Sequence, residues 1–243
     1  PRADRERSPV VPTGCDTFVT MSEAIPWSEL GGRFVVFDGP DGSGKSTQLR
    51  RFAAAAKAAG LTLCEVREPG GTEVGEAIRR VLLDPAHERM DMTCEMLLYM
   101  ASRAELAAQR IRPALERGEL VLADRFISST LAYQGTAGGL DVEDIYAVGR
   151  VALQDVWPDL VIVFDVDTAT AAWRMNPLLR EREFESDLDR IEMRGASYHE
   201  KVRRGYLQQA QRDPGRYVVV DARGDEQAVW DGLMRGVAGW MGR

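Results

Sequence analysis

A glycine-rich stretch from Gly39 to Thr47, GPDGSGKST, has the residue types and spacing of a phosphate-binding loop. Glycines permit positive φ and a close backbone approach, so that successive N–H groups can surround a di- or triphosphate. Lys45 would add a point charge near the outer phosphates, and the Ser46 hydroxyl can ligate Mg²⁺. Glycine-rich turns also join strands to helices without a ligand, but the Lys-Ser-Thr that follows favours a nucleotide. The predicted nucleotide-binding residues are Gly39, Asp41, Gly42, Ser43, Gly44, Lys45, Ser46 and Thr47.

Two charged residues, Asp124 and Arg125, follow an apolar run at residues 120–123. An arginine directly after a strand-terminal aspartate suggests a second anion, a phosphate acceptor, that faces the first nucleotide. The alternative is a structural ion pair between the two side chains. The sequence contains no guanine-binding NKxD motif, and neither Asp124 nor Asp165 is followed by the carboxylate with which hydrolytic ATPases orient water. These features favour a nucleotide kinase over a GTPase switch or a hydrolase.

Alternating strands and helices must position these residues. Apolar runs predict strands at residues 34–37, 61–66, 120–123, 160–164 and 217–220. Helical spacing predicts helices at residues 44–59, 73–83, 93–116, 127–133 and 142–153, one from about 168, one ending at about 212 and one at the C-terminus. Pro113 either kinks the helix at 93–116 or opens its last turn. This order predicts an α/β fold with a doubly wound, mainly parallel sheet and a site at the carboxyl ends of the strands.

The composition limits the class of protein. The 243 residues, 44% of them hydrophobic, suffice for one domain, which we predict at residues 32–243 after a flexible N-terminal extension at residues 1–31. The net charge of −7 argues against nucleic-acid and anionic-membrane partners. Cys15, Cys64 and Cys94 form no CxxC pair and suit a reducing compartment. Because no apolar run approaches the ~20 residues of a membrane span, we predict a cytoplasmic protein.

Five motifs occur in a specific order along the chain, and the first of them is the phosphate loop. They are GPDGSGKST, REPGGT at residues 67–72, LLYMASRAE at 97–105, ADRFISSTLAYQG at 123–135 and LDRIE at 188–192. With these motifs, the chain resembles thymidylate kinases of the bacterial type, which belong to the P-loop nucleoside monophosphate kinase family. The resemblance runs from Phe34 to the end of the chain. The resemblance implies a three-layer fold with about five parallel strands and a mobile lid. It also implies a homodimer and Mg²⁺-dependent transfer of the ATP γ-phosphoryl group to dTMP, giving dTDP.

The resemblance further implies how the acceptor and the metal are held. Asp41 would accept a hydrogen bond from the 3′-hydroxyl of the deoxyribose. Arg125 would clamp the dTMP phosphate. Asp124 would hold the Mg²⁺ shell through water, beside the Ser46 hydroxyl. Other residues implied at the acceptor site are Arg79 as a second phosphate contact, Thr130 and Gln134 near the base and the phosphate, and Tyr133 in the space that a ribose 2′-hydroxyl would need.

The thymine base would lie against one helix. Tyr99 resembles the aromatic residue on which thymine stacks, and Arg103, one helical turn later, could then reach the edge of the base. Taken without the family, Tyr99 would be a half-buried core aromatic and Arg103 a solvated charge.

The charged segment at about residues 174–190 is the predicted lid. Some relatives carry an arginine inside the phosphate loop, where this chain has Gly42, and those without it take their transition-state arginines from the lid. The candidates here are Arg174, Arg180 and Arg182, followed by Arg190 in LDRIE. The segment is longer, more acidic and less glycine-rich than the usual bacterial lid, and charge runs of this kind are usually a solvated face.

Two other functions remain open at this point. A kinase that acts on a nucleoside 5′-hydroxyl would need a carboxylate base rather than a phosphate-binding arginine. A non-catalytic nucleotide-binding regulator would not need the catalytic set to be intact. The predicted catalytic residues of the preferred function are Lys45, Asp124, Arg125, Arg174, Arg180 and Arg182, which with Mg²⁺ would spread positive charge over the transferring phosphoryl group.

Overall fold

The structure, a computed structural model, describes residues 25–175 and 189–243. Its centre is a sheet of five parallel strands in the order β2-β3-β1-β4-β5. The strands are β1 (Phe34–Asp38), β2 (Leu63–Arg67), β3 (Leu120–Asp124), β4 (Leu160–Asp165) and β5 (Tyr217–Asp221). All five predicted strands are present, which confirms the predicted α/β class.

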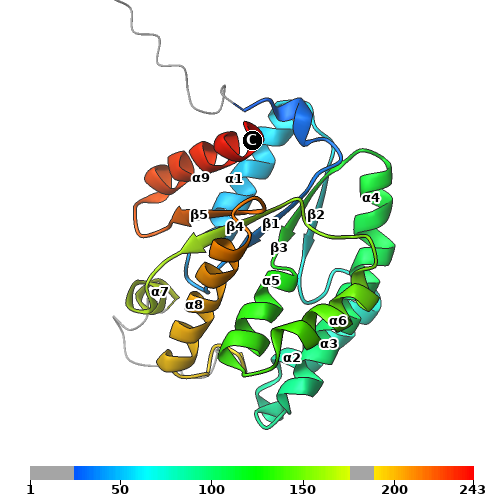
Figure 1. The fold of residues 1–243 in the computed structure, drawn as a ribbon, viewed down its shortest axis with the longest axis vertical. Coiled ribbons are helices and arrows are strands. Elements are labelled where there is room, and N and C mark those ends of the chain that lie inside the picture. Colours follow the sequence, from blue (N-terminus) through cyan, green and yellow to red (C-terminus); the bar gives the residue numbers. More distant parts are fainter. Residues whose placement is uncertain (1–24, 176–188) are drawn as a thin grey trace, which may run out of the picture.

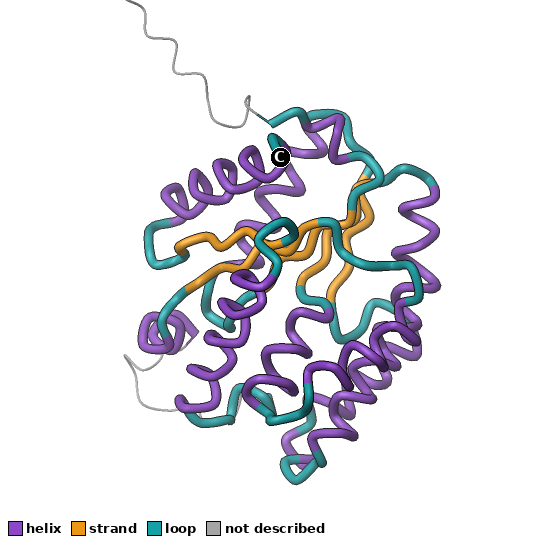
Figure 2. The backbone as a smooth tube through the Cα atoms, viewed as in Figure 1, coloured by secondary structure: helices purple, strands orange, loops and turns teal. Residues whose placement is uncertain are grey.

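Helices cover both faces of this sheet, giving three layers (Figures 1 and 2). On one side lie α1 (Lys45–Ala58) and α9 (Glu226–Met241), and on the other lie most of the remaining helices (Figure 1). The remaining helices are α2 (Glu73–Leu83), α3 (Met92–Leu106), α4 (Arg112–Glu116), α5 (Ile127–Thr130), α6 (Val142–Leu153), α7 (Thr168–Met175) and α8 (Ala196–Arg212). Each layer of helices buries its own hydrophobic cluster against the sheet.

The central strand explains where the site must lie. Every residue of β1 is buried, as expected for a strand of β-branched and aromatic residues with helices on both faces. The pairing register sets Phe37 opposite Asp124 of β3, and Asp38 opposite Val163 of β4. The carboxyl ends of β1, β3 and β4 therefore meet at one edge of the sheet, which is where ligands bind in folds of this class.

Two helices differ from the sequence prediction. The helix predicted at residues 93–116 is interrupted by a π-helical segment, Ala107–Ile111. Pro113 lies in the first turn of α4 and has no N–H to continue the ladder of α3, which accounts for the interruption. After α5, the chain also continues as a π-helical segment, Leu131–Ala137, rather than ending at residue 133. Segments of this kind often lie at functional sites, and this one carries two of the predicted site residues.

Helix α8 packs closely against the π-helical segment Leu131–Ala137, and a glycine makes this possible. A Cβ at Gly205 would lie 3.0 Å from the backbone Cα of Ala132 and 2.9 Å from Cβ of Thr136. Any larger residue at this position would push α8 away from the segment. Because Tyr206 follows directly, the same contact places this fully buried tyrosine where its hydroxyl donates to Asp38 at the end of β1.

Packed residues begin before residue 32, where the sequence places the start of the domain. Ile25 and Leu30 are buried, and the ring of Trp27 lies 5.0 Å from that of Phe52 in α1. The 3₁₀ turn Trp27–Leu30 therefore belongs to the packed domain, because its apolar side chains complete the cluster on the α1 face. The remainder of the predicted extension, residues 1–24, lies outside the described residues.

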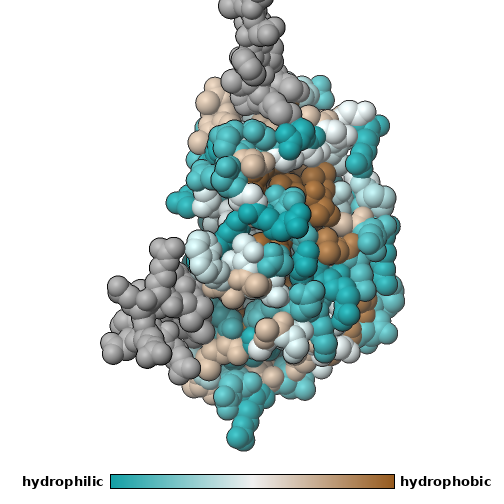
Figure 3. Space-filling view, turned by 90° about the vertical axis from the view of Figure 1, so that its left-hand side faces the viewer, coloured by the Kyte–Doolittle hydropathy of each residue, from teal (hydrophilic) through white to brown (hydrophobic). Residues whose placement is uncertain are grey.

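The described surface is mixed in polarity. Figure 3 faces the edge of the sheet formed by β5 and shows hydrophilic residues around a small hydrophobic patch at the height of that strand. Val219 of β5, which is an edge strand of the sheet, is 45% exposed. Within residues 25–175 and 189–243, no helix has the length and apolarity needed to cross a bilayer.

Candidate active site

The phosphate loop joins β1 to α1 and has the backbone shape that its sequence predicts. Gly39, Gly42 and Gly44 have φ angles of 139°, 75° and 83°, a region that other residues rarely adopt. A Cβ at Gly39 would lie 2.6 Å from the carbonyl oxygen of Phe164 in β4, so the loop can pass this close only as glycine. Helix α1 begins at Lys45, and the unpaired N–H groups of its first turn therefore adjoin the loop, as an anion site requires.

The two predicted metal-binding residues lie in contact. The Ser46 hydroxyl donates to Oδ2 of Asp124 across 2.9 Å, and Nζ of Lys45 lies 3.8 Å from Oδ1 of the same carboxylate. Hydroxyl and carboxylate oxygens beside a phosphate site suit Mg²⁺, which usually keeps several waters and binds substrate oxygens as well. Among the described residues, no cluster of three or more His, Cys, Asp or Glu side chains could hold a metal. The oxygens of Ser46 and Asp124 fit a magnesium ion that also binds the nucleotide.

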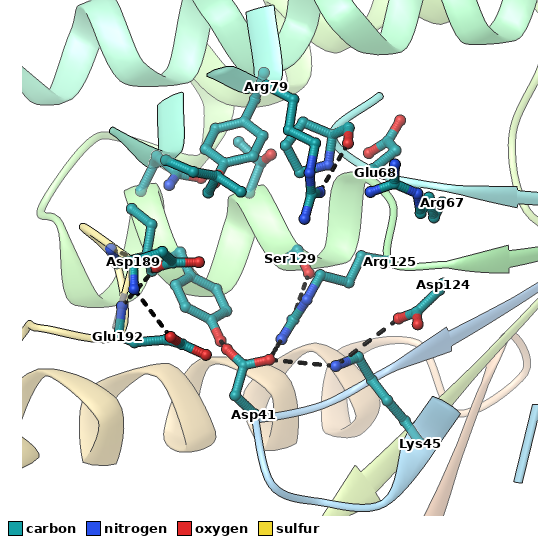
Figure 4. Close-up of a pocket in the computed structure, with 17 residues that line it drawn as sticks. Asp41, Lys45, Arg67, Glu68, Arg79, Asp124, Arg125, Ser129, Asp189 and Glu192 are labelled. Carbon is teal, nitrogen blue, oxygen red and sulfur yellow. Dashed lines mark hydrogen bonds and ion pairs between the residues drawn. The ribbon is translucent and has the colours of Figure 1, made fainter. Parts of the chain in front are cut away.

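A cavity of about 250 Å³ opens beside the loop at the carboxyl ends of β1 and β3. In Figure 4, Arg79 of α2 and Arg125, from the turn after β3, both point into this space. The predicted residues that line it are Asp41, Lys45, Arg79, Tyr99, Asp124, Arg125, Thr130, Tyr133 and Gln134. The sequence did not single out Arg67, Glu68, Ser129, Asp189 or Glu192, which line it as well. All five lie within the motifs quoted above: Arg67 and Glu68 in REPGGT, Ser129 in ADRFISSTLAYQG, and Asp189 and Glu192 in LDRIE. The motifs therefore mark these positions, although the sequence indicates no separate role for any of the five.

Asp41 is the charged centre between the loop and the cavity (Figure 4). Its Oδ1 lies 2.5 Å from a guanidinium nitrogen of Arg125 and 3.3 Å from Nζ of Lys45. Burial acts to raise the pKa of Asp41, but the charges of Arg125 and Lys45 outweigh it and hold the pKa well below its ordinary value. Asp41 is therefore ionised and can only accept hydrogen bonds, as contact with a sugar hydroxyl requires.

The position of Arg125 depends on a fully buried carboxylate, Asp38, which the sequence did not indicate. Asp38 accepts hydrogen bonds from the hydroxyls of Ser128, Ser129 and Tyr206 across 2.6, 2.8 and 2.6 Å. The same Ser129 and Tyr206 hydroxyls lie 3.2 and 3.1 Å from a guanidinium nitrogen of Arg125. Arg125 itself has φ of 70°, a strained conformation for a residue with a side chain, which directs it from the end of β3 toward the loop. Strain of this kind persists only where the surroundings fix the residue, as this network does.

The far wall of the cavity has apolar and polar features suited to a base. Tyr99 of α3 is half-buried, and burial raises the pKa of its phenol so that it stays neutral. Thr130 is 1% exposed, and among the described residues its hydroxyl has no hydrogen-bond partner. A buried polar group without a partner is costly, so this hydroxyl is available to a ligand. Arg79 donates to the carbonyl oxygen of Pro69 across 3.0 Å and keeps further N–H groups for the cavity.

The comparisons with known proteins agree with this geometry. The sequence model of the thymidylate kinase family matches residues 37–231. The chain is 43% identical over 206 residues to a thymidylate kinase of Desulforudis audaxviator, covering 83% of this chain and 90% of the relative. It is 44% identical over 200 residues to that of Pelotomaculum thermopropionicum, covering 82% and 90%. The chain belongs to the thymidylate kinase family. It is a kinase, and the alternative of a non-catalytic regulator is not favoured.

A solved structure supports the same assignment at the level of the fold. The crystal structure of thymidylate kinase from Ehrlichia chaffeensis is similar with a TM-score of 0.66 and 28% identity. The similarity covers 84% of this chain and 98% of that one. The five-stranded parallel sheet with helices on both faces is therefore the nucleoside monophosphate kinase fold that the sequence predicted.

One residue predicted to contact the base is bound elsewhere in the structure. Arg103 is 1% exposed, and its guanidinium donates to Oε2 of Glu68 across 2.8 and 2.6 Å instead of facing the cavity. Tyr99 and Arg103 do lie one turn apart on α3, as their spacing predicts. However, the guanidinium of Arg103 forms a bidentate ion pair with Glu68, from the turn after β2. Glu68, not Arg103, reaches the cavity surface.

Most of the predicted lid lies outside the described residues, and so do its candidates Arg180 and Arg182. Arg174, at the end of α7, is described, and it donates to the carbonyl oxygens of residues 222, 223 and 224 across 2.7, 3.1 and 3.2 Å. It therefore holds the loop between β5 and α9 in place. This placement does not support the predicted contact of Arg174 with phosphate.

Arg190, the next candidate, is also engaged elsewhere. It is 3% exposed, donates to the carbonyl oxygen of Leu82 across 2.8 Å, and forms an ion pair with Glu95. Arg190 therefore anchors the chain after the predicted lid to α2 and α3. A role of Arg190 in charge stabilisation has no support from this placement.

Proposed function

We propose that the cavity beside the phosphate loop binds dTMP and that its residues carry the reaction of this thymidylate kinase, in which the γ-phosphoryl group of ATP passes to dTMP and gives dTDP. The observation that supports this most strongly is the pair of cations on either side of Asp41. Lys45 belongs to the loop, and Arg125 belongs to the cavity, and both lie within 3.3 Å of the same carboxylate oxygen. A donor phosphate on one and an acceptor phosphate on the other would thus be neighbours.

In this proposal the protein positions two nucleotides and stabilises charge, which is most of what phosphoryl transfer requires. The loop holds the ATP phosphates with Lys45, and Arg125 and Arg79 hold the acceptor phosphate. Ser46 and Asp124 would hold Mg²⁺, which neutralises charge on the phosphate oxygens when bound. The buried hydroxyl of Thr130 and the half-buried ring of Tyr99 would receive the base. Arg125 favours a monophosphate acceptor over a nucleoside, because a nucleoside offers no anion to pair with it.

Incubation with ATP, dTMP and Mg²⁺, followed by separation of the nucleotides, tests this function. We expect dTDP and ADP in equal amounts, and neither in the presence of excess EDTA. Formation of ADP without dTDP would identify a hydrolase and contradict the proposal.

The 3′-hydroxyl of dTMP should contribute to turnover through Asp41. The structure shows that Asp41 keeps Arg125, Lys45 and the Tyr133 hydroxyl as partners, so loss of the sugar contact would not leave the carboxylate unpaired. We therefore expect the 3′-deoxy analogue to lose about 1 kcal/mol, the net value of one hydrogen bond, or roughly fivefold in kcat/KM. Steady-state kinetics with both substrates measures the ratio. Equal kcat/KM values would remove Asp41 from the sugar site.

We further propose a homodimer that uses α2, α3 and α6. Val74 and Val81 of α2, Leu97 of α3 and Val151 of α6 are large apolar side chains that are 48, 40, 48 and 78% exposed. A shallow groove runs between these helices and is lined by alanines of α3, including Ala104. Sedimentation equilibrium should give twice the chain mass, and Ala104→Arg should shift the protein to monomer. A monomeric parent protein would contradict this part of the proposal.

The cytoplasmic location stays a prediction.

A further inference from the structure

A second buried carboxylate, Glu95 of α3, lies behind the part of the cavity wall that carries Gln134 and does not itself line the cavity. Glu95 is fully buried, one helical turn before Tyr99. A buried charge is expensive unless it is paired and hydrogen-bonded, so its partners indicate what it does. Three side chains from two other parts of the chain converge on it.

The two oxygens of Glu95 have different partners. Oε1 accepts a hydrogen bond from Nε2 of Gln134 across 2.7 Å. Oε2 pairs with the guanidinium of Arg194 across 2.6 Å and with that of Arg190. Both guanidinium groups contact Oε2, and Oε1 accepts from Gln134, so every contact of this carboxylate uses an oxygen as the acceptor. Glu95 therefore ties the π-helical segment that carries Gln134 to the chain that follows the predicted lid.

This arrangement fixes the orientation of one amide in the cavity wall. Gln134 is 2% exposed, lines the cavity, and has one end that donates and one end that accepts. If its amide were turned over, the amide oxygen would face Oε1 of Glu95, and two acceptors would meet without a proton between them. The charge on Glu95 therefore holds the NH₂ group of Gln134 away from the ligand and leaves the amide oxygen as the end that can face it.

We propose that Glu95 is a positioning residue that determines base specificity, because it makes Gln134 present a hydrogen-bond acceptor to the base. The inference rests on the proposed function, in which this cavity binds dTMP. Thymine carries an N–H at ring position 3, which can donate to the amide oxygen. Cytosine has a lone pair at the same position, which the amide oxygen repels. A site built to pair one polar group rejects an analogue that lacks it more strongly than a hydrophobic pocket rejects a change of size.

Glu95→Gln tests the proposal with three substrates in one assay. The substituted side chain has nearly the same shape but can donate as well as accept, so the amide of Gln134 becomes free to turn over. We expect kcat/KM for dCMP relative to dTMP to rise about tenfold, within the range for one buried polar mismatch. The ratio of dUMP to dTMP should not change, because uracil keeps the N–H and differs only by the methyl group. A general loosening of the pocket would instead change both ratios.

Two further variants separate orientation from stability. Arg194→Gln removes one cation from Oε2 but leaves the contact between Glu95 and Gln134, so it should keep the dTMP to dCMP preference even where thermal unfolding shows lower stability. Gln134→Met keeps the volume and removes both polar ends, so it should lose the preference while Glu95 is intact, which tests the proposal even if Glu95→Gln does not fold. A folded Glu95→Gln or Gln134→Met enzyme that keeps the parent preference within twofold would overturn the proposal. Turnover of dTMP by the parent enzyme, measured alongside, reports on the proposed function separately.

Discussion

Replacing Lys45 with alanine is expected to lower phosphoryl transfer by ~10³-fold or more and to leave the fold intact. Nζ of Lys45 lies between Asp41 and Asp124, where the outer phosphates of ATP would bring negative charge. Its loss removes charge stabilisation that the transition state needs. The fold should tolerate the change, since Asp41 keeps its ion pair with Arg125 and Asp124 keeps its hydrogen bond with Ser46. A coupled assay of ADP formation with ATP and dTMP gives the rate, and circular dichroism gives the midpoint of thermal unfolding.

Lys57→Ala is the matched control for this variant. Lys57 lies on the same helix, and its ion pair with Glu65 is exposed and far from the cavity lining. Exposed ion pairs contribute little to stability, so this variant should keep the parent rate. If Lys45→Ala turned over dTMP at the parent rate, the loop would not be the donor site.

Replacing Arg125 with alanine should lower kcat/KM for dTMP by ~10³-fold, through both kcat and KM. Its guanidinium would bind the acceptor phosphate in the ground state and in the transition state, so its loss weakens both. The carboxylate of Asp38 keeps three hydroxyl donors in this variant, so the buried network should not collapse. Arginines that act only after a lid closes would behave differently, with lower kcat and a nearly unchanged KM for dTMP.

Initial rates over a range of dTMP concentrations separate these two signatures. Arg117→Ala serves as the control, because Arg117 is exposed, pairs with Glu119, lines neither the cavity nor the groove of the proposed dimer, and should be replaceable without loss of rate. A lower kcat with an unchanged KM for dTMP would show that Arg125 acts on the transferring group alone and does not clamp the acceptor. An unchanged kcat/KM would exclude Arg125 from the site.

The backbone shape of the phosphate loop is the part of this site that the residues alone predict, because it is determined locally. The phosphate loop follows from the spacing of Gly39, Gly44 and Lys45, because backbone shape and charge there depend on adjacent residues. The contact between Ser46 and Asp124, which are 78 positions apart, is expected from the family resemblance, and the parallel pairing of β1 with β3 brings the two residues together.

The parts that the sequence does not predict depend on contacts between distant segments. Asp38 and Tyr206 are separated by 168 positions, and only the packing of α8 beneath the loop joins them. Arg103 has the spacing for a base contact, yet Glu68 competes for it from another turn, and the spacing within a helix contains no information about such a competitor. The π-helical segment at residues 131–137 likewise has no local pattern that distinguishes it from an α-helix.

We propose above all that the cavity accepts a nucleoside monophosphate and prefers dTMP. The most direct test of this proposal is kcat/KM for ATP-dependent ADP formation with dTMP, dUMP, dCMP, dAMP, dGMP and thymidine as acceptors under one set of conditions. The proposed phosphate-binding role of Arg125 predicts no turnover of thymidine, and membership of the thymidylate kinase family predicts the highest value for dTMP. Preferential turnover of thymidine, or of another monophosphate over dTMP, would contradict the account.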